Sequence, residues 1–227
     1  FVISRKQLQY AFGNKKRQAL VIRTLPNLKE KLSRQYSNTN PPYLLEQTAE
    51  LLVEKEITTP QEINAQIDTM DARSPAMGAA VVARAWSDPE FKARLLSDGS
   101  AASREMGMDI GPMNLIAIEN TEDTHNIVVC TLCSCYPRNL LGLPPDWYKS
   151  RAYRSRTVKE PRKVLSEFGV TLPDTMKIRV HDSTADMRYV VIPSQPKGTE
   201  NLDESELAKL VTRDSMIGTG VALSPDA

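Results

Sequence analysis

From residue 43 onward, the hydrophobic positions recur with the period of an α-helix. Within 44–52 the leucines stand at i, i+1, i+7 and i+8, which places them on one face of a helix. Residues 59–62, Thr-Pro-Gln-Glu, are typical of a helix start, with Thr as N-cap, Pro in the first turn and Glu reaching back to the cap. Ser-Pro at 74–75 and Asp-Pro at 88–89 open two further helices in the same way. The pattern predicts a helical arm of several short segments over 43–107.

Beyond residue 107 the period changes to that of extended chain. Short apolar runs rich in β-branched residues, at 115–118 and 127–129, predict two strands. Two more strands are predicted at 177–181 and 187–192. The turn residues at 182–186 favour joining this second pair as an antiparallel hairpin.

Helical patterns alternate with these strands. They cover 146–155, 160–169, where Glu-Pro starts the helix and Gly ends it, and 203–211. The predicted fold class is therefore α+β. An N-terminal helical arm is followed, over 108–227, by a layered α/β domain of the α-β-β-α type that carries the metal-binding residues described below.

The first 42 residues differ from the rest in charge. Three interpretations stay open: an organellar transit segment, a basic arm lying along an acidic partner subunit, or a loosely held tail. Asn-Thr-Asn-Pro-Pro at 38–42 is typical of a linker, so 1–42 is predicted to be a basic extension or linker. A single acid, Glu30, stands in this segment against Arg5, Lys6, Lys15, Lys16, Arg17, Arg23, Lys29, Lys31 and Arg34.

The overall composition narrows the function classes. The chain has 227 residues, a net charge of +1 and 25% charged residues, a balance that indicates neither a nucleic-acid partner nor a membrane surface. No apolar run approaches the roughly 20 residues that a membrane-spanning helix needs. Clustered cysteines and the lack of a signal-peptide pattern favour a reducing, cytoplasmic location.

All three cysteines of the chain lie within six consecutive residues, as Cys130, Cys133 and Cys135. This Cys-x-x-Cys-x-Cys spacing lets three sulfurs face one point and favours a metal site. A disulfide scaffold is disfavoured because the number is odd. Structural zinc and iron–sulfur clusters normally need a fourth ligand, which only His125, His181 or another chain could supply. An open catalytic metal site is the favoured interpretation, with zinc and redox or structural thiols as alternatives.

The residues around the cysteines resemble a known family. Val-Cys-Thr-Leu-Cys-Ser-Cys-Tyr-Pro at 129–137 and Leu-Gly-Leu-Pro-Pro-Asp-Trp-Tyr-Lys-Ser at 141–150 are similar to the metal-binding (alpha) subunit of nitrile hydratases. The gamma subunit of the related thiocyanate hydrolase shares the three-cysteine motif. The resemblance covers roughly 43–222, with further similar stretches at 82–86, 88–96, 160–165, 178–183 and 211–218.

This resemblance implies a low-spin cobalt(III) or iron(III) ion, one per chain. Its ligands would be the sulfurs of Cys130, Cys133 and Cys135 and the backbone amides of Ser134 and Cys135. Thr131 is similar to the cobalt variant of the motif. Cys133 would be oxidised to a sulfinic acid and Cys135 to a sulfenic acid, and a beta-type subunit would supply arginines to the oxidised sulfurs in a hetero-oligomer.

The implied reaction is the hydration of a nitrile to an amide. Cys135 as a nucleophile or base and Ser134 as a hydrogen-bonding group are the catalytic candidates, and Thr131 and Arg138 are candidates for the substrate pocket. Arg138 stands where nitrile hydratases usually carry Trp and thiocyanate hydrolases carry Arg. The alternatives are therefore a thiocyanate hydrolase and, outside enzymes, a zinc-stabilised interaction module. Asp182 and Arg188 are either supporting groups of the site or an ordinary turn acid and surface base.

Overall fold

The computed structural model describes residues 41–133 and 135–225. The chain divides into two compact units, Phe1–Thr69 and Met70–Ala227. In the described part of the chain, no helix combines the length and the apolar character that crossing a membrane would require.

The described part of the first unit is helical. Helix α3 spans Pro41–Glu54, and α4, Pro60–Asp71, begins in this unit. At the start of α4 the Thr59 amide donates to Glu62 Oε2 at 3.0 Å, and the Glu62 amide donates to Thr59 Oγ1 at 3.1 Å. This reciprocal pair is the capping box that the sequence predicts.

The second unit opens with three helices, α5 (Pro75–Ser87), α6 (Pro89–Ser97) and α7 (Gly99–Glu105). Asp88 starts α6 as predicted, because its Oδ1 accepts from the amides of Glu90 and Phe91 at 3.0 Å each. These three helices belong to the same compact unit as the strands. The boundaries predicted after residues 42 and 107 stay predictions.

Four strands form two parallel pairs. Strand β1 (Asn114–Glu119) pairs with β4 (Met187–Ile192), and β2 (Thr124–Val129) pairs with β3 (Lys177–Asp182). The predicted antiparallel hairpin of β3 and β4 is therefore wrong. A period-two pattern specifies which face of a strand is buried but not its partner. Here each later strand pairs with one of the two apolar strands from the middle of the chain, and 183–186 connects the two pairs.

The second half also contains short helices around the strands. The predicted helix at 146–155 is two helices, because Ser150 ends α9 and then caps α10 by accepting from the Tyr153 amide at 3.1 Å. Gly169, with φ of +82°, follows α11 as predicted. The helices are α8 (Arg138–Leu141), α9 (Asp146–Lys149), α10 (Arg151–Lys159), α11 (Pro161–Glu167), α12 (Glu204–Leu210) and α13 (Arg213–Ile217).

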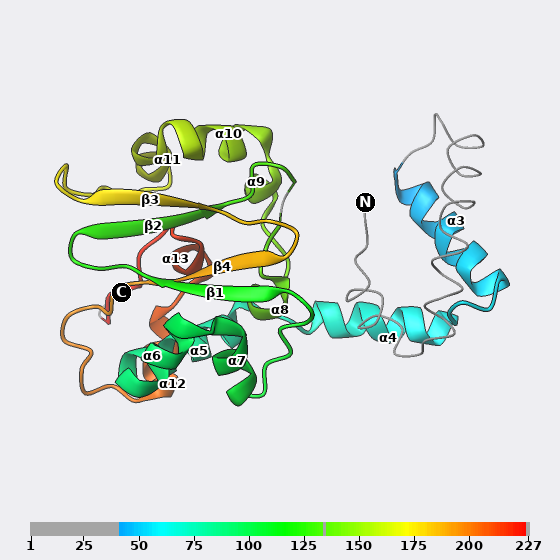
Figure 1. Ribbon diagram of the computed structural model, residues 1–227, viewed down its shortest axis with the longest axis horizontal. Helices are drawn as coiled ribbons and strands as arrows, with labels where there is room; N and C mark the ends of the chain where they lie inside the picture. The colour runs from blue at the N-terminus through cyan, green and yellow to red at the C-terminus, as the bar shows by residue number, and fades with distance from the viewer. Residues whose placement is uncertain (1–40, 134, 226–227) are drawn as a thin grey trace. The chain divides into compact units, whose positions relative to one another are not determined.

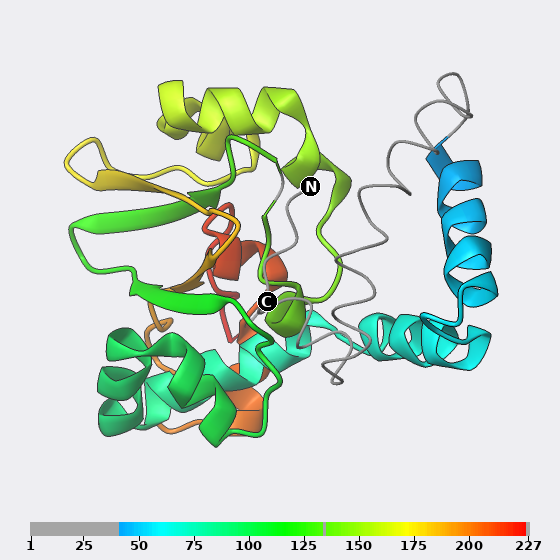
Figure 2. The same ribbon diagram turned by 45° about the vertical axis from the view of Figure 1, so that its right-hand side comes forward.

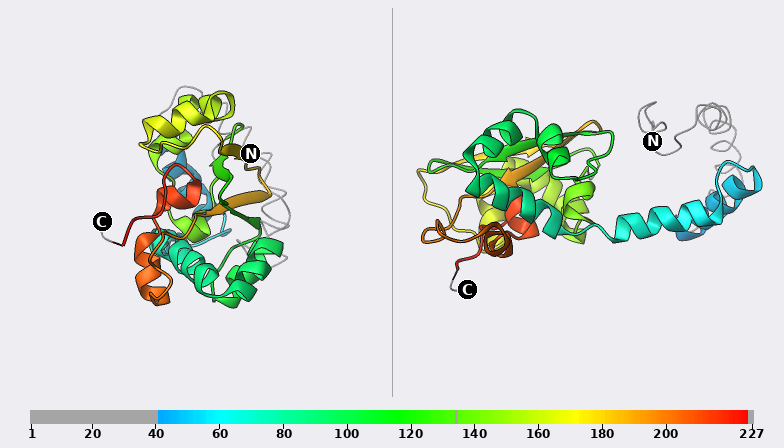
Figure 3. Two further views of the ribbon diagram at one scale, coloured as in Figure 1. Left: turned by 90° about the vertical axis from the view of Figure 1, so that its left-hand side faces the viewer. Right: turned by 90° about the horizontal axis from the view of Figure 1, so that it is seen from below.

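Within this unit, helices lie on opposite sides of the strands. Figure 1 shows α10 and α11 beyond β3, while α5, α6, α7 and α12 lie beyond β1, and Figure 2 shows the same arrangement after rotation. The end-on view in Figure 3 again separates the two groups of helices. Contacts agree, since α10 touches β2 and α11 touches β3, whereas α6 and α7 touch β1. The mixed helix and strand composition is confirmed; the four-layer order and the separate helical arm stay predictions.

Candidate metal centre

The three cysteines begin directly after β2, whose last residue, Val129, stands opposite Asp182 of β3. The Ser183 amide donates to the Val129 carbonyl at 2.7 Å, so the pairing continues one residue past the strand. Residues 127–130 are fully buried, which fixes the start of the following loop. The loop therefore begins at a strand end that is buried and hydrogen-bonded.

The cysteine sulfurs converge in this loop. Cys130 Sγ lies 3.4 Å from Cys133 Sγ, and Cys133 Sγ lies 3.0 Å from Cys135 Sγ. All three sulfurs lie within 4.8 Å of one another. In the described ranges 41–133 and 135–225, this is the one group of three or more His, Cys, Asp or Glu side chains with ligand atoms so close together.

The three thiols differ in exposure. Cys130 is buried, Cys135 is half-buried and Cys133 is exposed. Burial, together with the hydrogen bond to Cys133, raises the pKa of the Cys135 thiol to about 12, while the positive charge of Arg188 acts in the opposite direction. A thiolate at Cys135 at neutral pH thus requires an additional positive charge close to the sulfur. A bound cation supplies such a charge.

Side chains from β3 and α10 hold the loop between the cysteines. Asp182 accepts two hydrogen bonds from Thr131, from its amide at 2.9 Å and from its hydroxyl at 2.5 Å. Arg154 donates through Nη1 to the Thr131 carbonyl at 3.3 Å. Asp182 therefore contacts the loop directly. Thr131 itself is exposed, and its hydroxyl is engaged by Asp182.

Two tyrosines hold the backbone on either side of the loop. Tyr153 donates to the Val128 carbonyl at 2.7 Å, and Tyr148 donates to the Cys135 carbonyl at 2.8 Å. Sequence reasoning missed Tyr148, Tyr153 and Arg154. The sequence does contain one usable signal, which is that Tyr148 lies within the stretch 141–150 that resembles the family, and the other two side chains follow within six residues.

Arg188 extends from the start of β4 towards the same region. Its Nη1 donates to the carbonyls of Thr184 and Met187, the latter at 3.1 Å. Its Nε is buried and has no hydrogen-bond partner among the described residues, and the same is true of Arg154 Nε. Two buried guanidinium N–H groups beside the cysteine loop are thus available to an acceptor.

The other site residues considered from the sequence are Ser134, Arg138, His125 and His181. Ser134 lies outside the described residues. Arg138 is exposed at the start of α8, and among the described residues its side chain makes no hydrogen bond or ion pair. His125 Nε2 donates to the Gly218 carbonyl at 2.8 Å, and His181 Nε2 donates to Asn126 Oδ1 at 2.8 Å. Neither histidine joins the three cysteines, so the described part of this chain supplies no fourth ligand for zinc.

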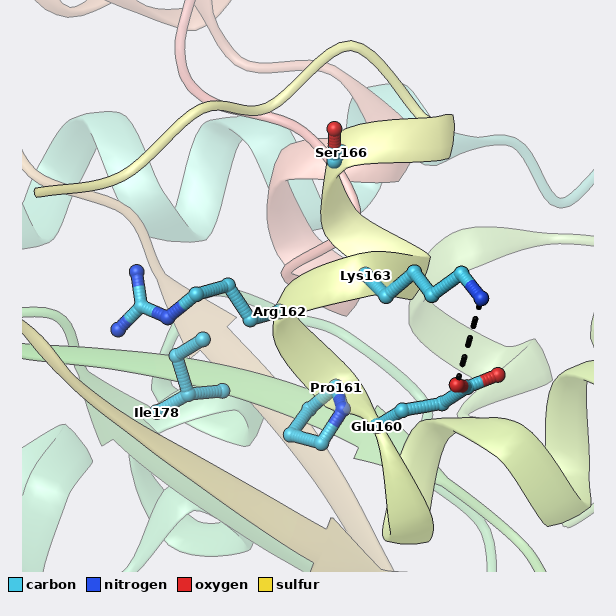
Figure 4. Close-up of a pocket in the computed structure, with 6 residues that line it drawn as sticks. All are labelled: Glu160, Pro161, Arg162, Lys163, Ser166 and Ile178. Atoms are coloured by element: carbon cyan, nitrogen blue, oxygen red, sulfur yellow. Dashed lines mark ion pairs between the residues drawn. The ribbon is translucent and has the colours of Figure 1, made fainter. Parts of the chain in front are cut away.

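A separate cavity lies along another part of the same unit. It has a volume of about 590 Å³ and lies along α11 and Ile178, with Arg162 and Lys163 pointing in different directions from the helix (Figure 4). Lys163 pairs with Glu160 at 3.8 Å, and Arg162 donates to three carbonyls of 172–176, so its charged groups are already engaged. None of its lining residues belongs to the cysteine loop. Within the loop, Thr131, Leu132 and Cys133 are exposed.

A comparison with known families decides the affiliation of the chain. A sequence model described as "Nitrile hydratase, alpha chain" matches residues 41–220. The chain belongs to the nitrile hydratase alpha-chain family. The resemblance seen in the sequence is thereby confirmed, and the chain belongs to a family of enzyme subunits.

Individual members of the nitrile hydratase alpha-chain family show the same affiliation. The alpha subunit of the low-molecular-weight cobalt-containing nitrile hydratase of Rhodococcus rhodochrous is 56% identical over 66% of this chain and 73% of its own length. The thiocyanate hydrolase gamma subunit of Thiobacillus thioparus is 41% identical over 76% of each chain. A solved structure of a histidine-to-alanine double variant of the iron-type nitrile hydratase of Comamonas testosteroni superposes with a TM-score of 0.74. It is 40% identical, over 83% of this chain and 95% of its own.

Proposed function

We propose that this chain is the metal-bearing subunit of a nitrile hydratase, which hydrates nitriles to amides at a low-spin cobalt(III) ion. The ion would be held by Cys130, Cys133 and Cys135 together with the amides of Ser134 and Cys135. The convergence of the three sulfurs at the end of β2 is the observation that carries the proposal. The cobalt-containing relative and the exposed Thr131 between the first two cysteines favour cobalt, with iron(III) as the alternative.

The sulfur spacing supports an ion with ligands at right angles. Two sulfurs at about 2.3 Å from one ion lie about 3.3 Å apart at a right angle and about 3.8 Å apart in a tetrahedron. The observed separations of 3.4 Å and 3.0 Å are close to the right-angle value. Thiolates and deprotonated amides are strong donors, which suit a trivalent low-spin ion better than zinc. When bound, such an ion supplies Lewis-acid activation of a nitrile or of water.

Residues of this chain would supply the hydrogen bonds and the nucleophile or base of the reaction. Cys133 as a sulfinic acid and Cys135 as a sulfenic acid would carry anionic oxygens, which need hydrogen-bond donors when partly buried. The unpartnered Nε groups of Arg154 and Arg188 support such an arrangement from within this chain. The Cys135 oxygen would attack the nitrile carbon or accept the proton of an attacking water. The Ser134 hydroxyl would orient that water.

A second subunit would complete the site. The cysteine loop presents an exposed Cys133, and Leu132 has 86% of its surface exposed, while the cavity along α11 contains no residue of the loop. A beta-type subunit covering this loop would enclose the substrate and add arginines to the oxidised sulfurs. We place the assembled enzyme in the cytoplasm, and residues 1–42 remain a basic extension of unassigned role.

Thiocyanate hydrolysis to carbonyl sulfide and ammonia is the second candidate. It is favoured by Arg138, an exposed cation that makes no ion pair among the described residues and lies three positions after Cys135. A cation near the substrate would favour an anion over a neutral nitrile. The thiocyanate hydrolase relative is also similar over three quarters of the chain.

Parallel assays separate the two reactions. The chain, produced with cobalt and its partner subunit, is offered a small aliphatic nitrile and, separately, thiocyanate. Amide release without ammonia supports nitrile hydration, whereas ammonia and carbonyl sulfide from thiocyanate support the second candidate. Arg138→Trp should weaken turnover of thiocyanate about tenfold or more if the charge binds the anion. Unchanged turnover would remove the argument from Arg138.

A further inference from the structure

Three backbone carbonyls around the cysteine loop accept hydrogen bonds from one short segment of the chain. Tyr153 bonds the carbonyl of Val128, two residues before the first cysteine, and Tyr148 bonds the carbonyl of Cys135, the last one. Arg154 bonds the carbonyl of Thr131 between them. A single segment, 148–154, thus fixes both ends and the middle of the loop.

The tyrosine donors are themselves held rigidly. The Tyr148 side chain is fully buried and Tyr153 is 5% exposed. Tyr148 packs against Tyr136 with ring centroids 5.0 Å apart, and Tyr153 packs against Trp147 at 4.9 Å, both edge to face. Burial raises the pKa of both phenols, so each hydroxyl stays protonated and able to donate across the whole neutral range.

The break between α9 and α10 allows this arrangement. An unbroken helix would put residues five apart on different faces, because successive residues turn by about 100°. Ser150 instead ends one helix and caps the next, so that Tyr148 and Tyr153 lie with ring centroids 5.6 Å apart and both reach the loop. The positions of the two hydroxyls therefore follow from local sequence.

We propose that Tyr148 is a positioning residue of the metal centre, which holds the cysteine loop in its metal-binding conformation through the Cys135 carbonyl. The proposal rests on the proposed function, since it assumes that the three sulfurs bind an ion. The hydroxyl donates to the Cys135 carbonyl, which is not one of the proposed ligand atoms. Its effect is to order the last cysteine before the ion arrives, so that binding does not have to order the loop.

The test measures metal affinity and needs no turnover. Reduced, metal-free full chain is titrated anaerobically with Co²⁺ alone, and thiolate-to-cobalt absorption reports binding. Tyr148→Phe keeps the ring and removes only the hydroxyl, and it should weaken Co²⁺ binding about tenfold, the size expected for one lost hydrogen bond in a buried site. Arg154→Met, which removes the more exposed middle contact, should weaken binding severalfold.

Tyr189→Phe is the matched control. Tyr189 is half-buried on β4, its ring packs against His181 at 5.2 Å, and it belongs to none of the contacts of the loop. The affinity of the Tyr189→Phe variant for Co²⁺ should equal that of the unchanged chain. Thermal unfolding of each metal-free variant separates a general loss of stability from a change at the site.

The outcomes are distinct. Absence of thiolate-to-cobalt absorption in the unchanged chain would refute the metal centre itself. Equal affinities of the unchanged chain and Tyr148→Phe would refute the positioning role alone, and so would a lower melting temperature with unchanged affinity. If Tyr148→Phe does not fold, Arg154→Met tests the support of the same loop through the Thr131 carbonyl. An unchanged affinity there would overturn the premise that 148–154 positions the loop for metal binding.

Discussion

Two groups of potential metal ligands lie close to β2 and β3, and they differ in what their ligand atoms contact. In the cysteine loop, the sulfurs of Cys130, Cys133 and Cys135 contact one another, and surrounding side chains bind the backbone of the loop. In the histidine network, the ring nitrogens are bound by the protein itself. His181 donates to Asn126, and the His125 ring lies between Asn120 and the Gly218 carbonyl.

The comparison shows that residue type alone does not identify a metal ligand, because the contacts of the ligand atoms differ between the two groups. Histidine commonly binds metals, yet both histidines are used here for hydrogen bonds within the fold. His181 joins β3 to β2, and His125 joins β2 to Gly218, which ends α13. The cysteine loop has the opposite arrangement, with a fixed backbone and ligand atoms turned towards one another. Ligand atoms that converge on one point indicate a binding site, whereas ring nitrogens that are hydrogen-bonded within the fold indicate a structural role. Substitutions in the two groups should therefore have different effects on metal binding and on stability.

Replacing one cysteine should abolish metal binding, whereas replacing one histidine should not. Cys133→Ala removes the sulfur that lies nearest to both others, and we expect the purified variant to contain essentially no cobalt and to have no turnover. His181→Asn should retain the cobalt content of the unchanged chain. Elemental analysis of the two variants checks this, and a cobalt-free His181→Asn would erase the distinction between the two groups.

Weakening the support of the loop should reduce metal binding without abolishing it. Asp182→Asn removes the negative charge that accepts from the Thr131 amide and hydroxyl. Groups that orient metal ligands are typically worth about 10–100-fold in affinity or activity, and we expect a loss of that size in Co²⁺ affinity. Asp174→Asn, at an exposed acid of the loop before β3, is the control and should bind normally. Equal affinities for both variants would show that Asp182 is an ordinary turn acid.

Breaking the histidine network should reduce stability and leave the metal in place. His125→Phe would leave the Gly218 carbonyl and the Asn120 amide without their buried partner, so we expect a loss of about 2–4 kcal/mol in the free energy of unfolding. Urea unfolding of the metal-free chain measures it. A variant of normal stability that has lost cobalt would contradict a structural role for His125.

The same network should make stability depend on pH. Burial lowers the pKa of both His125 and His181 in the folded chain. Protonation of His125 would also place a hydrogen on Nδ1, which faces the Asn120 amide donor. Because the folded pKa values are depressed, the contribution to stability is complete above the ordinary value of about 6.5 and is lost as the pH falls below it. The loss should reach at most about 1.4 kcal/mol per pH unit for each histidine.

Urea unfolding at several pH values between 5 and 8 tests the histidine contribution. His125→Phe should show a smaller decline below pH 6.5 than the unchanged chain does. An identical decline in both would assign the pH dependence to other groups.

The sequence predicted those features that depend on nearby residues. Helix starts at Thr59 and Asp88, the strands β1 and β2, and the helix end at Gly169 all follow from short patterns, and the structure contains each of them. The convergence of the three sulfurs also follows from close spacing along the chain. These features can be predicted without knowing which distant segments of the chain contact one another.

The missed features all depend on distant partners. The pairing of β3 with β2 rather than β4 is a choice between strands that period-two patterns cannot make. Asp182 reaches Thr131 across 51 residues, and Tyr148 reaches a carbonyl, a group that every residue has. A side chain that binds a backbone group leaves no complementary residue type in the sequence, so nothing marked Tyr148 as a support of the loop.

We propose that Cys130, Cys133 and Cys135 bind one low-spin trivalent ion with two of the sulfurs oxidised. The most direct measurement combines elemental analysis of an active preparation with mass spectrometry of the peptide that contains 129–137. We expect about one cobalt per chain and three added oxygen atoms, two on Cys133 and one on Cys135. Zinc in place of cobalt, with three unmodified thiols in an active preparation, would contradict it.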